Sequence, residues 1–176
     1  MIGDDDMQLP VRKANRLQGF DYNSYGSYFI TICVKERHAI LSNIIPSTQT
    51  HGTLGTASPT IMLTEYGLIV EEALHSVGDN NVNAFIDRYV IMPDHVHFIL
   101  TIVGGAVPSA PQNEPIVAPQ TQMVPRIMKW FKRITNQKIG FAIWQRSYHD
   151  HVICSEEEYW NVYQYIQSNP IEWLKR

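Results

Sequence analysis

The segment RYVIMPDHVHFILTIV, at positions 88–103, carries two histidines, His95 and His97, at alternate positions of an otherwise apolar run. Successive side chains of a β-strand point to opposite faces, so the two imidazoles share one face of the strand. The apolar side chains that alternate with them share the other face, which suits packing on a core. Two imidazoles on one stiff strand can chelate a single cation. A His-x-His pair on a strand is also compatible with a purely structural role, so further residues must decide between the two interpretations.

The second group with chemical potential lies in SEEEYWNVYQYIQSNP, at positions 155–170, which predicts a helix. Ser155 is a good N-cap, Glu158 completes a capping box, and acidic residues in the first turn suit the positive helix N-terminus. Pro170 is expected to end this helix.

In projection along this helix, Tyr159, Tyr163 and Ile166 fall on one stripe, which predicts the side that packs on the core. Tyr165 lies about 120° away from that stripe, because successive residues rotate by about 100°. Asn169 lies one turn after Tyr165 on nearly the same face. This pairing makes a phenol and an amide available for chemistry, although an interfacial aromatic is the alternative for Tyr165.

The basic residues gather in two groups although the net charge of the 176-residue chain is −3. A locally basic surface can bind phosphate groups, and a solvated helix face is the alternative. Within 125–146 no Asp or Glu occurs. The basic residues are Arg12, Lys13 and Arg16 near the N-terminus, and Arg126, Lys129, Lys132, Arg133, Lys138 and Arg146 in the second group.

The remaining pattern predicts an α+β domain with a mostly antiparallel sheet and packed helices. A run rich in β-branched and aromatic residues predicts a buried strand, and apolar residues at helical spacing predict two further helices. Trp130 in the second of these helices suits either the core or stacking on a base. The predicted strands are 27–36, 88–102, 141–145 and 148–154, and the predicted helices are 64–75, 124–137 and 155–170, with a turn at 79–83.

Length and composition favour one domain over 1–176, with a flexible tail at 1–11 and loops at 46–60 and 104–122. The acidic start MIGDDDMQLP lacks the pattern of a secretory signal, and no apolar run approaches the ~20 residues that span a membrane. Cys33 and Cys154 form neither a metal spacing nor a disulfide framework. We therefore expect a cytoplasmic protein.

Four segments occur in an order that resembles the REP-associated tyrosine transposases, relatives of the single-strand transposases in the HUH endonuclease superfamily. They are RKANRLQGFDYNSYGSYFITICVKER, MPDHVHFIL, IWQRSYHDHVI and YIQSNP, with a basic helix between the second and the third. The resemblance extends from about Arg12 to Trp173. His-x-His alone is a weak motif, whereas the ordered set is specific.

The resemblance implies a ferredoxin-like HUH endonuclease architecture and an activity on single-stranded or hairpin DNA. It makes His95 and His97 metal ligands for Mg²⁺ or Mn²⁺, Asn169 a candidate third ligand, and Tyr165 the nucleophile that forms a 5′-phosphotyrosine. A free tyrosine has a pKa of about 10, so a nearby cation would help a phenolate to attack at neutral pH. Duplex DNA is stiff, so single strands and hairpin flanks are the expected substrates.

The sequence departs from this family at two positions. Many members have an arginine where this chain has Cys154 and an aromatic residue where it has His149. His149 forms a rival i, i+2 pair with His151. We interpret His151 as the structural histidine of the family and His149 as solvent-facing, and the segment 144–146 receives no assigned role.

Three functions remain open at this stage. The first is a metal-dependent nuclease and strand transferase, the second a catalytically silent protein that binds DNA hairpins, and the third a hydrolase that uses water instead of Tyr165. A covalent protein–DNA adduct separates the first from the others. The resemblance leaves a monomer and a homodimer both open.

Overall fold

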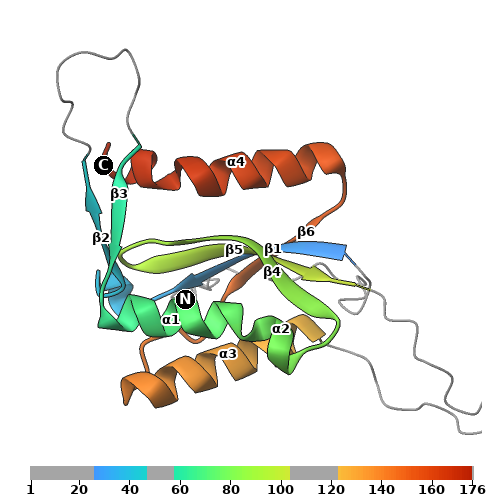
Figure 1. The fold of residues 1–176 in the computed structure, drawn as a ribbon, viewed down its shortest axis with the longest axis horizontal. Helices are drawn as coiled ribbons and strands as arrows, with labels where there is room; N and C mark the ends of the chain where they lie inside the picture. Colours follow the sequence, from blue (N-terminus) through green and yellow to red (C-terminus); the bar gives the residue numbers. More distant parts are fainter. Residues whose placement is uncertain (1–25, 47–57, 104–122, 176) are drawn as a thin grey trace, which may run out of the picture.

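A four-stranded antiparallel sheet forms the centre of the computed structural model, which describes residues 26–46, 58–103 and 123–175 (Figure 1). Its strand order is β4-β5-β1-β6. The strands are β1 (Gly26–Cys33), β4 (Ala84–Ile91), β5 (His95–Ile102) and β6 (His149–Ile153). The predicted α+β class and the antiparallel sheet are confirmed.

The single strand predicted over 88–102 is in fact the hairpin of β4 and β5, which turns at Met92–Asp94. Pro93 explains the break, because proline has no N–H to donate to a strand ladder. Met92 closes the turn by donating its N–H to the carbonyl oxygen of His95 at 2.8 Å. The predicted alternation along β5 is confirmed, since Val96 and Phe98 are buried in the main core.

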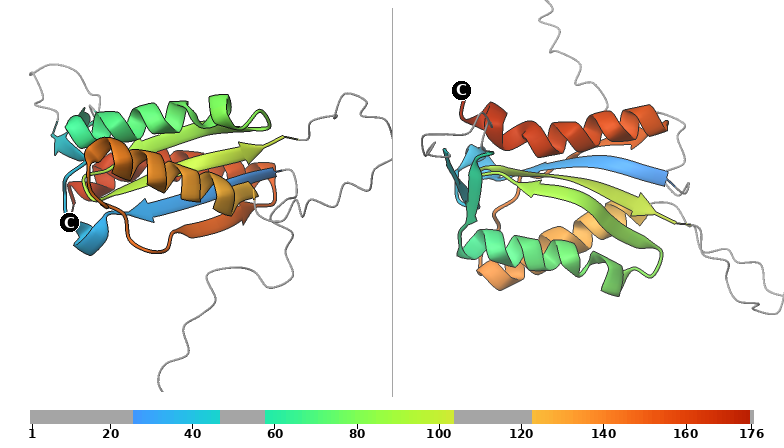
Figure 2. Two further views of the ribbon diagram at one scale, coloured as in Figure 1. Left: turned by 90° about the horizontal axis from the view of Figure 1, so that it is seen from below. Right: turned by 45° about the horizontal axis from the view of Figure 1, so that its top comes forward.

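Helices cover both faces of the sheet, and the two layers differ in size (Figures 1 and 2). On one face lie α1 (Glu65–His75), the short α2 (Val77–Asn80) and α3 (Met123–Ile139). On the other face α4 (Glu156–Trp173) lies alone. The helices predicted over 64–75 and 124–137 are confirmed to within two residues. The turn predicted at 79–83 begins as the end of α2.

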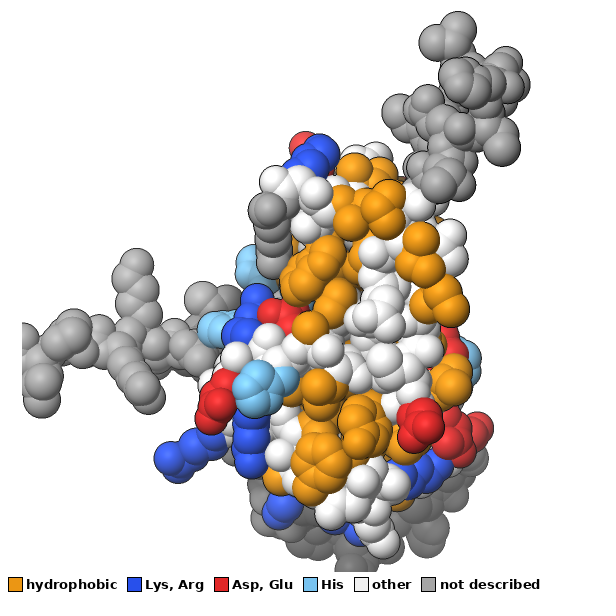
Figure 3. Space-filling view, turned by 90° about the vertical axis from the view of Figure 1, so that its left-hand side faces the viewer, with side chains coloured by type: hydrophobic (Ala, Val, Ile, Leu, Met, Phe, Trp, Pro, Cys, Tyr) orange, Lys and Arg blue, Asp and Glu red, His pale blue; other side chains and the backbone are white. Residues whose placement is uncertain are grey.

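A two-stranded ribbon of β2 (Ser42–Ile45) and β3 (Thr60–Leu63) closes one end of these layers. Ile44 and Ile61 pack toward α4, whereas Leu63 packs on the main core. Figure 3 looks onto this end, where apolar side chains run down the middle of the surface. The ribbon was not predicted, and Thr60 falls inside the predicted loop 46–60, most of which lies outside the described residues.

The strand predicted over 141–145 is wrong, because this segment makes a single bridge, Val34 to Trp144. The indole of Trp144 donates to the hydroxyl of Thr135 at 2.7 Å and is buried in the core under α3. The segment 148–154 does form a strand, β6. A three-residue 3₁₀ turn, η1 (Lys35–Arg37), follows β1.

The start of α4 follows the sequence signals, whereas its end does not. Ser155 accepts from the N–H of Glu158 at 3.1 Å, as predicted for the N-cap. The carboxylate of Glu158 accepts from the N–H of Cys154 at 2.6 Å, one residue before the position that a capping box uses. Pro170 lies inside the helix, which continues to Trp173. The helix outlasts the lost hydrogen bond because Trp173 packs against the apolar cluster beneath α4.

Candidate functional site

The two histidines of β5 lie side by side under α4 and are held by buried neighbours. His95 and His97 are 2% and 5% exposed, and their ring centroids are 4.5 Å apart. The hydroxyl of Thr31 lies 2.8 Å from Nδ1 of His97. Thr31 pairs with His97 across the ladder, so the sheet register itself brings the hydroxyl to the ring. This contact makes Nε2 of His97 the nitrogen that can bind a cation.

The imidazole ring of His95 is held by a carboxylate, which is itself paired with a guanidinium. Nδ1 of His95 makes a short hydrogen bond with the carboxylate of Asp94. Asp94 in turn receives the guanidinium of Arg37, whose Nε lies 3.0 Å away. A carboxylate oxygen accepts hydrogen bonds, so Nδ1 of His95 carries the proton and Nε2 is the nitrogen without one. Ligand histidines in metal sites are oriented in this way by a carboxylate.

Arg37 reaches Asp94 from a strained turn. Glu36 and Arg37 have positive φ values of 54° and 59°, which side chains other than glycine rarely adopt. Such strain costs on the order of 1–3 kcal/mol per residue and persists where surrounding contacts hold it. Here Arg37 bonds both to Asp94 and to the sulfur of Cys33, at 2.8 Å. These two contacts hold the guanidinium next to Asp94, the carboxylate that orients His95, although the backbone at Glu36 and Arg37 is strained.

The phenol of Tyr165 lies over the histidine pair. Its ring centroid is 5.3 Å from His97 and 5.8 Å from Phe29, whose ring stacks on His97 at 5.3 Å. Tyr165 is 47% exposed, whereas Tyr159 and Tyr163 are partly buried in the cluster beneath α4. We call His95, His97, Phe29 and Tyr165 the His–Tyr cluster.

Asn169 occupies the stretch of α4 between the two contacts with the histidines. Tyr165 touches His97, and Trp173, two turns later, has its ring 6.1 Å from His95. Asn169 lies midway along the helix between them and is 4% exposed. This placement fits a third ligand. The roles of His95, His97, Asn169 and Tyr165 remain predictions.

Three of the neighbours described here were missed from the sequence. Asp94 directly precedes His95, so its position was a usable signal. Thr31 and Arg37 are distant in the chain from both histidines, and only the pairing of β1 with β5 and the strained turn bring them close.

Two other tyrosines have hydroxyls that are unsuited to attack a phosphate. Burial, together with the hydrogen bond to Asp87 at 2.6 Å, raises the pKa of Tyr159 to about 12. Burial and the hydrogen bond to Glu71 at 2.9 Å raise the pKa of Tyr89 to about 12. Both phenols donate to a carboxylate and therefore keep their protons.

Alkaline titration tests these two hydroxyls. Tyr89 and Tyr159 should ionise well above pH ~10, the unperturbed pKa of tyrosine, which ultraviolet absorbance of tyrosinate measures. Their folded pKa values exceed the unfolded value of about 10, so their contribution to stability is complete below pH ~10 and is lost as the pH rises toward ~12. Asp87→Asn should shift one late ionisation downward. A tyrosinate signal of the folded protein that is complete near pH ~10, with no later phase, would contradict the assignment.

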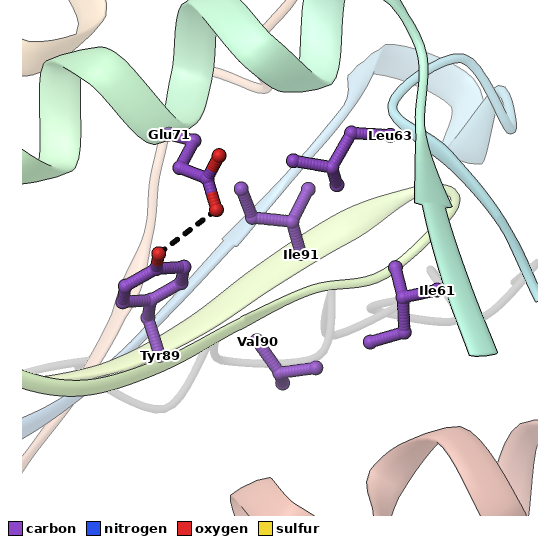
Figure 4. Close-up of a pocket in the computed structure, with 6 residues that line it drawn as sticks. All are labelled: Ile61, Leu63, Glu71, Tyr89, Val90 and Ile91. Carbon is purple, nitrogen blue, oxygen red and sulfur yellow. Dashed lines mark hydrogen bonds between the residues drawn. The ribbon is translucent and has the colours of Figure 1, made fainter. Parts of the chain in front are cut away.

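A cavity of about 220 Å³ lies next to β4 and shares no residue with the His–Tyr cluster (Figure 4). Its polar wall is the hydrogen-bonded pair of Glu71 and Tyr89, and its other lining side chains are aliphatic. It is lined by Ile61, Leu63, Glu71, Tyr89, Val90 and Ile91. The two polar groups of the lining are hydrogen-bonded to each other.

Helix α3 carries exposed basic side chains, and it lies on the opposite face of the sheet from α4, the helix of Tyr165 (Figure 2). These are Arg126, Lys129, Arg133 and Lys138, the last of which pairs with Glu72. A DNA strand in contact with both surfaces would have to pass around the sheet. The other predicted group, Arg12, Lys13 and Arg16, lies outside the described residues. Trp130 packs against the main core.

Lys132 has an internal role that the sequence did not predict. Its ammonium donates to the carbonyl oxygens of Gln145, Arg146 and Ser147 at 2.8, 3.0 and 3.3 Å. Burial lowers the pKa of Lys132. The three donors of the ammonium are therefore used within the protein, and a phosphate contact by Lys132 would require breaking them.

The rival histidine pair on β6 is divided between two roles. His151 Nε2 lies 2.5 Å from the carboxylate of Glu158, which holds β6 to the first turn of α4 and lowers the pKa of Glu158. His149 is exposed, as predicted. The two rings do not converge on one point, because His151 is hydrogen-bonded to Glu158 of α4.

The two imidazoles of the His–Tyr cluster, together with the amide of Asn169 on α4, are side-chain types that suit a divalent cation. Within residues 26–46, 58–103 and 123–175, no group of three or more His, Cys, Asp and Glu side chains could hold a metal ion. Asn169 is not a donor of that kind. The orientation of both rings by Asp94 and Thr31 is the feature that suits them to coordination.

None of the helices described here is long and apolar enough to cross a membrane.

Comparisons with known proteins agree with this architecture. No protein-family model matches the chain. An uncharacterized protein of Haemophilus influenzae is 33% identical over 174 residues, which cover 92% of this chain and 89% of that protein. A solved structure of a REP-associated tyrosine transposase, bound to a REP hairpin, matches with a TM-score of 0.54 and 19% identity, over 85% of this chain and 70% of the other. The chain therefore belongs to the family of the Haemophilus influenzae protein, and its fold is that of a REP-associated tyrosine transposase.

Proposed function

We propose that this protein is a metal-dependent endonuclease and strand transferase that acts on single-stranded or hairpin DNA through Tyr165. One observation carries the proposal: the exposed phenol of Tyr165 lies 5.3 Å, ring to ring, from His97, which pairs with His95, and Nδ1 of both histidines is already engaged. This contact supports a role for Tyr165 as nucleophile beside a histidine pair that would hold a cation.

His95, His97 and Asn169 would hold the cation, Mg²⁺ or Mn²⁺. When bound, such an ion neutralises the charge of the phosphate and polarises its bonds to oxygen. Imidazole nitrogens favour transition metals, so Mn²⁺ should bind more tightly than Mg²⁺. The burial of both rings under α4 keeps the two nitrogens in place before DNA arrives.

Tyr165 then attacks the phosphorus of a phosphodiester. The phenolic oxygen forms a bond to phosphorus, the bond from phosphorus to the 3′ oxygen breaks, and the phenolic proton passes to solvent. The released 3′ oxygen takes a proton from solvent, and the 5′ end stays on the protein as a phosphotyrosine. One phosphoester replaces another, so attack by a 3′-hydroxyl reverses the step without ATP and joins the strands.

The solved transposase that shares this fold is bound to a REP hairpin. In this chain the side chain of Tyr165 is exposed to solvent. A flexible strand can bend across such a surface, whereas a stacked duplex cannot. A single strand that flanks a hairpin is therefore the proposed substrate.

Covalent trapping tests this function. Labelled single-stranded hairpins from the DNA that flanks the gene, incubated with the protein and Mn²⁺, should give a band of lower mobility on a denaturing gel. A blunt duplex of the same sequence should give none, and chelation should abolish the band.

The competing function is a catalytically silent protein that binds DNA hairpins. It predicts retarded DNA on native gels without any covalent species. A cut strand without an adduct would instead indicate a hydrolase that uses water. Either result with the whole set of hairpins would reject the proposed mechanism.

A further inference from the structure

The edge of the sheet is interrupted close to the His–Tyr cluster. Gln145 donates its N–H to the carbonyl oxygen of Cys33 at 2.9 Å, and four residues later His149 pairs with Thr31. A single residue of β1 therefore faces residues 146–148, so this strand contains two more residues than a regular ladder would. We call residues 146–148 the edge bulge. Bulges are frequent beside active sites, where they redirect side chains.

Lys132 holds the edge bulge in one shape. Its ammonium contacts three successive carbonyl oxygens, from Gln145 to Ser147, and also lies 5.8 Å from the centre of the Tyr148 ring. An ammonium that is half withdrawn from water is stabilised by such carbonyl dipoles. The bulge is thus tied to α3 from within rather than left as an open loop.

The side chains that flank the bulge face the same side of the sheet as the histidine pair. Thr31 pairs with His97 on one side and with His149 on the other, and directly paired residues share a face. His149 is therefore on the face that α4 covers, two strands or about 10 Å from His97. Gln145 lies opposite Cys33, which shares the face of Thr31 on β1, so Gln145 is on this face as well. Arg146, between them, is exposed.

We propose that Gln145, Arg146 and His149 form a phosphodiester-binding subsite that receives the DNA strand adjacent to the phosphate attacked by Tyr165. This inference rests on the function proposed above. A guanidinium matches a phosphate with two parallel N–H donors, and an amide and an imidazole add further donors. Among the described residues, Arg37, Lys138 and Lys175 each lie within 3.0 Å of a carboxylate oxygen. Arg146 forms no such ion pair in this part of the chain. Its charge is thus available to a ligand.

This subsite differs from the basic face of α3 in position. The edge bulge adjoins the sheet face of the His–Tyr cluster, whereas Arg126, Lys129 and Arg133 lie across the sheet. A strand seated at Tyr165 can reach the bulge without passing around the protein. Arg146 is one of the basic residues expected from the sequence to contact phosphate, and the bulge places it, with Gln145, beside the sheet face of the His–Tyr cluster.

Binding of a labelled single-stranded oligonucleotide, measured by fluorescence anisotropy with chelator present, tests the subsite. Arg146→Gln should raise Kd about tenfold or more, the effect of losing one hydrogen-bonded charge. The slope of log K against log salt should become shallower by about 0.7, as expected for one phosphate contact on a single strand. Lys138→Gln is the control, because it removes one charge from α3, where Lys138 pairs with Glu72 at 2.7 Å.

Equal Kd values and slopes for the two variants would overturn the subsite. In adduct formation, Arg146→Gln should raise the half-saturating DNA concentration and leave the rate at saturation within about twofold, since uniform binding is lost. A lower rate of adduct formation at saturating DNA, with an unchanged half-saturating DNA concentration, would also overturn the subsite. If wild-type protein gives no adduct but Arg146→Gln weakens binding, the proposed function fails and the subsite stands.

Discussion

Tyr165→Phe is expected to abolish DNA cleavage while leaving the protein folded. The phenyl ring keeps the contacts with His97 and Phe29, and the lost hydroxyl belongs to a half-exposed side chain. Stability should therefore change by no more than about 0.5 kcal/mol. Loss of a nucleophile lowers turnover by on the order of 10⁴-fold or more. Denaturing gels with trapped hairpin DNA measure the loss, and thermal unfolding measures the stability.

Two neighbouring tyrosines of α4 provide matched controls. Tyr163→Phe should leave cleavage close to that of the wild type, because the Tyr163 ring packs under the guanidinium of Arg88 at 4.7 Å. Tyr159→Phe removes the hydrogen bond to Asp87, so it should lower stability by about 1 kcal/mol without removing the adduct. Mass spectrometry of the trapped peptide should locate the phosphate on Tyr165. An adduct on Tyr159 or Tyr163, or normal cleavage by Tyr165→Phe, would reject the mechanism.

The parts of the fold that depend on local patterns could be predicted from the sequence. The alternation of histidines with Val96 and Phe98 follows from the two-residue period of a strand, and the structure buries those apolar residues. The N-cap at Ser155 is likewise a local signal, because its hydroxyl bonds only three residues away.

The errors arose where distant contacts override local signals. Pro170 normally stops a helix, but packing of Trp173 under α4 continues it. Strands β2 and β3 have four residues each and pair across a long polar segment, so neither has a pattern of its own. The β4–β5 hairpin turns through an apolar run with only Pro93 as a signal.

The residues of the candidate site also fall into those that the sequence indicates and those that only the folded structure brings together. His95, His97, Tyr165 and Asn169 stand out by residue type and spacing. Their supporting partners do not, because Thr31 reaches His97 through strand pairing and Arg37 reaches Asp94 through two left-handed residues that no propensity predicts. The position of α3 behind the sheet is also a property of the whole fold, so basic composition alone could not place it relative to Tyr165.

Replacement of both His95 and His97 by alanine should remove Mn²⁺ binding and cleavage together. Two imidazoles that share a strand face supply most of the donor set, so the affinity for Mn²⁺ should fall more than 100-fold, which calorimetry measures. Asp94→Asn keeps the volume of the side chain and loses the charge that orients His95, and should cost about 10–100-fold in affinity. Asn169→Ala should weaken binding while leaving both imidazoles in place.

The control for this series is His75→Ala, since His75 lies on α1, on the other face of the sheet, and bonds Tyr89 at 3.0 Å. It should bind Mn²⁺ and cleave DNA as the wild type does. Both replaced histidines of β5 are buried, so circular dichroism must show that the double variant is folded before its affinity is interpreted. A folded double variant with unchanged Mn²⁺ affinity and unchanged cleavage would show that the pair is structural. Loss of Mn²⁺ binding with cleavage intact would separate the cation from the chemistry and leave Tyr165 to act without it.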